Sequence, residues 1–215
     1  MSSTEVEELF ESRVTKKLLD LDTGEYVDDP PEGYDPRKAA KDDAQNEPIE
    51  GFDIGLANRE KLTWVYLVQD SGGKIEKVVV PIYGMGLWST LYGYVALEND
   101  LATVAGLTYY QHGETPGLGG EVENPAWKAK WIGKKIWDAG KGPAMATDED
   151  LRIGVAKGAP VGENQKYQVD GLSGATITSR GVESMLKYWF SSEGFGPYLK
   201  NLASQQGATS GETNS

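Results

Sequence analysis

The middle of the chain has the residue pattern of antiparallel strands. Residues 62–68 and 75–82 are rich in β-branched and aromatic side chains, and a turn sequence at 70–73 separates them. This pattern predicts a β-hairpin. Further strands are predicted at 91–97, 104–110 and 151–155, the first two as a second antiparallel pair.

Helical spacing is clearest towards the end of the chain. Apolar side chains at 182, 185, 186, 189 and 190 predict an amphipathic helix with Thr178 or Ser179 as its N-cap, ended by the glycines at 194 and 196. Asn124 is a predicted N-cap of a short helix through residue 131, and residues 5–19 predict another helix. Strands in the middle with helices at the ends predict an α+β fold, in which an antiparallel sheet is flanked by helices.

Composition excludes several classes of function. The 215 residues include 21 Lys and Arg and 33 Asp and Glu, a net charge of −12, which argues against a nucleic-acid partner. With no cysteine and one histidine, the chain cannot build a thiolate or multi-histidine metal site. Composition leaves an all-oxygen site for a hard cation open, but we predict no metal-binding residue. We expect His112 to be structural rather than catalytic, because no hydrolytic triad is recognisable around it.

The charge is uneven and suggests a division of the chain. Residues 1–50 hold 15 acidic and 6 basic side chains. We therefore expect residues 1–55 to form an acidic lead segment that wraps the body, residues 56–204 to form one globular domain, and the polar tail 205–215 to be disordered. No apolar run approaches the ~18 residues that cross a bilayer.

A first motif, residues 170–176, precedes the predicted late helix. It reads Asp170-Gly171-Leu172-Ser173-Gly174-Ala175-Thr176. Small side chains let a bulky ligand approach the backbone, and the N–H groups at a helix start favour a phosphate. The same residues also suit a capped turn without a ligand.

A second motif, residues 114–125, begins Glu114-Thr115-Pro116-Gly117-Leu118-Gly119-Gly120. Such a loop exposes backbone groups and often lines a site, although an ordinary turn between strand and helix has a similar composition. A third motif, residues 84–89, reads Gly84-Met85-Gly86-Leu87-Trp88-Ser89, and it lacks the third glycine of a dinucleotide fingerprint.

Together the three motifs resemble a family. They are similar to the C subunit of the sodium-translocating NADH:quinone oxidoreductase, a bacterial respiratory complex, and the likeness extends to residues 20–24 and 194–197. The resemblance implies an FMN-binding domain in residues 56–204 and a flavin joined by a phosphoester to Thr176. The cofactor would do the redox chemistry while the protein holds and tunes it.

The resemblance also implies which residues surround the flavin. Trp88 and Leu118 would pack near the isoalloxazine ring. Glu114 and Thr115 would bond to polar parts of the cofactor, and Lys157 would place a cation nearby. The other cofactor-binding residues it implies are Ser173, Gly174, Ala175, Thr178, Gly117 and Gly119. The chain would have no catalytic residue and no complete activity of its own.

Partners and location follow from the same resemblance. They would be the other subunits of the complex and a flavin transferase, because Thr176 has no evident activating base. Relatives carry an N-terminal membrane helix, so we expect an anchor missing from this sequence and a place on the periplasmic face of the bacterial inner membrane. The alternative is a soluble relative without membrane association. Two alternatives stay open, the G-type subunit of an Rnf complex and a ligand-binding module without a redox role.

Overall fold

The centre of the molecule is a six-stranded antiparallel sheet. The computed structural model describes residues 12–138 and 140–212, and the strands follow the order β2-β1-β5-β6-β7-β8. Their bounds are β1 Val14–Asp20, β2 Glu25–Tyr26, β5 Leu62–Gln69, β6 Ile75–Met85, β7 Thr90–Glu98 and β8 Val104–Gln111. Both predicted antiparallel pairs are confirmed, as β5 with β6 and β7 with β8.

Short elements surround this sheet. Strands β3 (Asn46–Pro48) and β4 (Asn58–Glu60) pair antiparallel, and β9 (Gly154–Ala156) and β10 (Gln168–Asp170) pair parallel. The helices are α2 Pro36–Ala39, α3 Pro125–Ala129, α4 Thr176–Trp189 and α5 Gly196–Glu212, with 3-10 turns η1 Gly119–Glu123, η2 Asp148–Asp150 and η3 Gly162–Lys166. Among the described residues, no helix is both long and apolar enough to span a bilayer.

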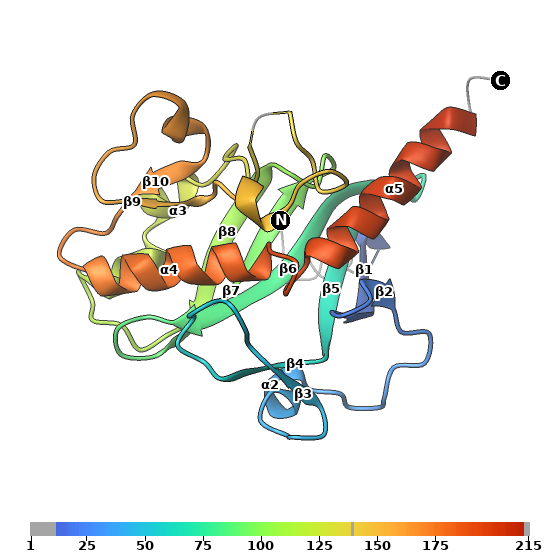
Figure 1. Cartoon of the computed structure of the whole chain (residues 1–215), viewed down its shortest axis with the longest axis horizontal. Helices are drawn as coiled ribbons and strands as arrows, with labels where there is room; N and C mark the ends of the chain where they lie inside the picture. The colour runs from blue at the N-terminus through green and yellow to red at the C-terminus, as the bar shows by residue number, and fades with distance from the viewer. Residues whose placement is uncertain (1–11, 139, 213–215) are drawn as a thin grey trace.

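Helix α4 lies across one face of the sheet, which confirms the predicted amphipathic helix (Figure 1). Its side chains Val182, Met185 and Leu186 are buried in the same core as alternate residues of β6 and β7. The approach is close: a Cβ on Gly84 of β6 would lie 2.8 Å from Met185 Cβ. The α+β fold class is therefore confirmed, and the sheet supports the start of α4.

The predicted helix at 5–19 is wrong over residues 14–19. These residues form β1, which pairs with β5 from Val14 opposite Val68 to Asp20 opposite Leu62. Leu18 and Leu19 are both buried, on opposite sides of the strand. Backbone hydrogen bonding to β5 and burial on both sides outweigh a helical spacing that short. Residues 5–11 of that prediction lie outside the described residues.

One other expectation differs from the structure, and the division of the chain stays open. Of the strand predicted at 151–155, only residues 154 and 155 lie in a strand, β9, while Leu151 forms an isolated bridge with Trp137. Helix α5 runs from Gly196 to Glu212, and the disorder expected of the tail 205–215 stays a prediction. Strand β1 belongs to the central sheet, so the segment 1–55 contributes to the same sheet as 56–204, and the exact domain division stays a prediction.

Candidate functional site

The first motif connects β10 to the start of α4. Gly174 in this turn has φ +71°, a left-handed conformation that favours glycine. A Cβ at this position would also lie 2.9 Å from Leu118 Cδ2 of the second motif. The glycine therefore serves both the turn and the contact between two motifs.

Helix α4 begins at Thr176, before both predicted N-caps. No side chain caps it at Ala175. Thr178 Oγ1 donates to Glu114 Oε2 at 2.6 Å, and Ser179 Oγ accepts from Leu172 N at 2.9 Å. The cap prediction is wrong because both hydroxyls bond to other parts of the protein. The N–H groups of the first turn, which have no partner within a helix, are left for a ligand or solvent.

Glu114 of the second motif joins all three motifs through its carboxylate. Oε1 accepts hydrogen bonds from the amides of Trp88 at 2.8 Å and Ser89 at 3.2 Å. Oε2 accepts from the amide of Leu87 at 3.1 Å and from the Thr178 hydroxyl. Segments more than twenty residues apart in the chain are thus tied to one side chain.

The same contacts keep this carboxylate charged. Burial, which leaves Glu114 5% exposed, raises its pKa, but hydrogen bonds from Thr178 and the loop amides outweigh it and hold the pKa below its ordinary value. His112 Nδ1 accepts from the Glu114 amide at 3.1 Å, and its Nε2 lies 3.3 Å from Glu123 Oε1. His112 supports the loop, in agreement with the structural role expected for it.

Large apolar side chains stay exposed on these joined segments. Trp88 is 68% exposed and Leu87 41%, on the loop between β6 and β7. Leu118 is 43% exposed on the second motif, and Ile177 55% in the first turn of α4. Apolar side chains gathered on connected segments indicate a surface for a ligand or a partner. Thr176, next to Ile177, is exposed as well.

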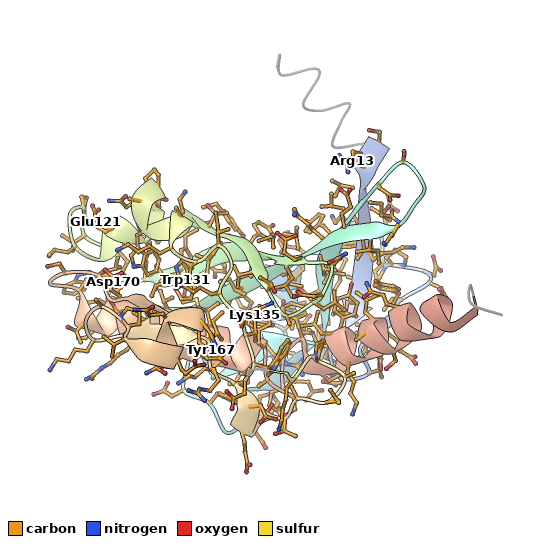
Figure 2. The ribbon with its side chains drawn as sticks, turned by 90° about the horizontal axis from the view of Figure 1, so that it is seen from above. Arg13, Glu121, Trp131, Lys135, Tyr167 and Asp170 are labelled. Carbon is orange, nitrogen blue, oxygen red and sulfur yellow. The ribbon has the colours of Figure 1, made fainter. Side chains whose placement is uncertain are left out.

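The three motifs gather at one end of the molecule. In Figure 1 the start of α4, the loop between β6 and β7 and the loop after β8 lie together at the left. In Figure 2, Glu121 of the second motif and Asp170 of the first lie at one end and Arg13 at the other. Of the other predicted residues here, Ser173, Thr115 and Gly117 are exposed, and Ala175 and Gly119 are buried.

Lys157 also lies beside the first motif. It follows β9 directly, and the preceding residue, Ala156, accepts a backbone hydrogen bond from Gly171 N at 2.9 Å. Its side chain is exposed. The structure therefore places the segment that carries Lys157 beside the segment that carries Thr176.

Sequence reasoning assigned no role to two residues that build the site. Ser89 Oγ accepts from Gly113 N at 2.6 Å and links the loops before β7 and after β8. Gly181 lets α4 rest on the end of β6, since a Cβ there would lie 2.1 Å from Met85 O. A glycine inside a helix costs about 1 kcal/mol relative to alanine, so Gly181 itself was the available signal.

Residues 20–24 and 194–197, the two other segments that resemble the family, meet away from this site. A Cβ on Gly24 would lie 2.5 Å from the Pro197 carbonyl carbon, and Asn201 Nδ2 donates to the carbonyls of Thr23 and Gly24 at 3.1 Å. They lie where α5 begins, beyond the far end of α4 from Thr176. Their role is to join the edge of the sheet to α5.

Comparison with known proteins agrees with this arrangement. A family model described as an FMN-binding domain matches residues 86–191, which include parts of all three motifs. The C subunit of the Na(+)-translocating NADH-quinone reductase of Pseudomonas aeruginosa is 48% identical over 207 residues, covering 94% of this chain and 76% of that protein. The same subunit of Yersinia pestis is 44% identical over 94% of this chain and 73% of its own length.

Solved structures show the same relationship. The crystal structure of Shewanella oneidensis NqrC superposes with a TM-score of 0.81 at 36% identity, covering 95% of this chain and 90% of that one. The corresponding subunit of Parabacteroides distasonis gives 0.66 at 28% identity, covering 94% and 84%. The chain therefore belongs to the family of the C subunit of the Na(+)-translocating NADH-quinone reductase, the family that its three motifs resemble.

Proposed function

We propose that this chain carries FMN on Thr176 Oγ1, through a phosphoester, and relays electrons through that flavin. As a family member the chain is an electron-transfer flavoprotein subunit of the sodium-translocating NADH:quinone reductase, and the activity belongs to the complex. The attachment to Thr176 is inferred from how the structure places the hydroxyls around the start of α4.

The observation that carries the assignment is the exposure of Thr176. Thr178 and Ser179 are buried, and their oxygens are engaged with Glu114 and Leu172. Ser173 is exposed but lies before the helix, whereas Thr176 is its first residue. Of these four hydroxyls, that of Thr176 combines exposure with a place in the helical turn whose N–H groups and dipole favour a phosphate.

The surroundings of Thr176 fit FMN. The phosphate, as a diester, keeps one negative charge, which suits the uncapped N–H groups of α4. The exposed side chains of Trp88, Leu118 and Ile177 offer apolar surface for a flat ring. When bound, the flavin supplies the redox chemistry.

The remaining cofactor contacts are proposals of the same kind. Trp88 and Leu118 pack against the isoalloxazine, Thr115 bonds to a polar group, and Lys157 sets a positive charge near the ring, which favours its reduced, anionic forms. Gly117 has φ +74°, and a Cβ added there would meet no atom within 4 Å, so the backbone of its loop stays open to the ligand.

We propose that a second protein attaches the flavin. The sequence offers no evident activating base for Thr176, and an unperturbed hydroxyl is a poor nucleophile. In the step we propose, a flavin transferase uses FAD and Mg²⁺. The Thr176 Oγ1–phosphorus bond forms, the pyrophosphate bond of FAD breaks, and AMP and a proton leave.

The partners of the chain follow from its family, and its anchoring and orientation are proposed in addition. As part of the complex, the chain has the other subunits as partners at a membrane. We propose in addition that it is held there by a helix outside this sequence and that this domain faces the periplasm. The similarity to the C subunit of several species, at 42–48% identity, supports this complex rather than the G-type subunit of an Rnf complex.

Intact-mass measurement tests the attachment site. Protein made together with the transferase should gain the mass of FMN less one water and stay yellow after acid precipitation. Thr176→Ala should abolish both, while Ser173→Ala, a matched change on an exposed hydroxyl in the same motif, should keep them. Loss of the label in Thr178→Ala but not in Thr176→Ala would place the attachment two residues later. Colourless wild-type protein would refute the flavoprotein assignment.

A further inference from the structure

We propose that Glu114 is a positioning residue that ties the Trp88 loop to helix α4, and that its carboxylate does not contact the flavin. This inference rests on the proposed function and deepens it. It replaces the role that the resemblance implied for Glu114, a direct bond to the cofactor.

The carboxylate has no acceptor capacity left for a ligand. A carboxylate offers about four lone-pair sites. In this protein the two oxygens accept four hydrogen bonds, from the amides of Leu87, Trp88 and Ser89 and from the Thr178 hydroxyl. A polar group of the cofactor would have to displace one of these donors, and an amide left without its partner costs free energy.

The surrounding backbone is fitted closely to this side chain. A Cβ on Gly86 would lie 2.7 Å from Glu114 Oε1, and one on Gly119 would lie 2.5 Å from Oε2 and 2.7 Å from Thr178 Oγ1. Both positions need glycine for space, since neither has a positive φ. The third motif, the second motif and the start of α4 therefore close around the carboxylate and leave it 5% exposed.

The consequence concerns Trp88 and Thr176. The indole of Trp88 is 68% exposed, so side-chain packing holds it only weakly, and its place depends on its backbone. That backbone is bonded to Glu114, which is bonded to Thr178, two residues from Thr176 on the same rigid helix. Glu114 thus sets where a ring-contacting side chain lies relative to the point where the flavin is attached.

The experiment compares three variants with the wild type. Glu114→Gln keeps the shape but loses the charge and replaces one acceptor oxygen with an amide group that can only donate. Thr178→Val removes one of the four donors. Glu121→Gln is the matched control, because it removes one negative charge from the same segment yet keeps an acceptor for Asn124 Nδ2, the bond its side chain makes here.

Two measurements decide the question. The first is hydrogen exchange at the amides of Leu87, Trp88 and Ser89 in protein made without the transferase. Because hydrogen bonds to charged groups are among the stronger ones, Glu114→Gln should speed this exchange about tenfold to a hundredfold. Thr178→Val should have a smaller effect, and Glu121→Gln should have none. The second is the visible circular dichroism and fluorescence anisotropy of the attached flavin, both of which should fall in Glu114→Gln while the covalent mass persists.

The outcomes separate this inference from the proposed function. If the wild type carries no flavin, the proposed function fails, and the exchange data still test the contacts of Glu114. If Glu114→Gln changes neither exchange nor flavin signal, Glu114 does not position the loop. If exchange stays slow but attachment or the flavin signal is lost, Glu114 acts directly on the cofactor and the inference is overturned.

Discussion

Replacing Gly181 with alanine should destabilise the protein, although the same change inside an ordinary helix stabilises it. Gly181 lies within α4, where alanine is favoured over glycine by about 1 kcal/mol. Here a Cβ would lie 2.1 Å from Met85 O and 3.4 Å from Gly86 Cα. The nearest atom is backbone at the end of a sheet strand, so no side chain can rotate to relieve the contact.

The size of the effect follows from two opposing contributions. Overpacking typically costs about 1–3 kcal/mol, and a contact this short with backbone belongs at the upper end. After the gain in helix propensity, we expect the free energy of unfolding to fall by about 1–2 kcal/mol. For a chain of this size that lowers the melting temperature by about 2–4 °C per kcal/mol.

Urea unfolding followed by tryptophan fluorescence measures this change, since Trp131 and Trp189 are fully buried. Gly106→Ala is the control, because a Cβ at that position in β8 meets nothing within 4 Å, and it should change stability by no more than about 0.5 kcal/mol. If Gly181→Ala is as stable as the wild type or more so, the packing of α4 on β6 described above is wrong.

Three further predictions concern the flavin, a helix cap and acid stability. Leu118→Asp should change the flavin absorption spectrum or midpoint potential while intact mass still shows covalent FMN, and an unchanged potential would leave the second motif a structural loop only. Asn124→Ala removes the side-chain bond to Ala126 N at 2.9 Å and should cost about 1 kcal/mol in urea unfolding, whereas Asn124→Ser, whose hydroxyl can still accept from that amide, should cost less. Burial raises the pKa of Asp100, but hydrogen bonds, the largest from Thr103, lower it to about 2. The charged Asp100 therefore stabilises the fold above the unfolded pKa of about 3.9, and this stabilisation is lost as the pH falls towards 2. Asp100→Asn should therefore be less stable than the wild type at pH 6, and a gap that persists unchanged at pH 2 would contradict this reasoning.

Local patterns were sufficient for much of the fold. The strands between 62 and 110 were predicted because their turns and β-branched runs act over neighbouring residues. Helix α4 was predicted because five apolar residues follow one helical face, and α3 because Asn124 precedes a proline. In these cases the local preference and the tertiary packing favour the same structure.

Predictions failed where a distant segment competes for the same groups. The apolar residues from Val14 to Leu19 have helical spacing, but the edge of strand β5 offers them backbone hydrogen-bond partners that the local sequence does not contain. Thr178 and Ser179 have the residue types of an N-cap, but their hydroxyls bond to Glu114 and Leu172. The sequence does not show whether a hydroxyl near a helix start will cap that helix or bond to a distant segment.

The sequence alone indicated the family, because three motifs in the same order resemble the C subunit of the sodium-translocating NADH:quinone oxidoreductase, and the flavin chemistry was implied by that resemblance. Tertiary structure decided how these loops work together. Only folding brings Glu114 to the amides of Leu87 and Trp88 and to Thr178, since hydrogen bonds act over about 3 Å while the segments lie more than twenty residues apart. The same folding buries Thr178 and leaves Thr176 at the surface, a distinction that two neighbouring threonines do not carry in their sequence.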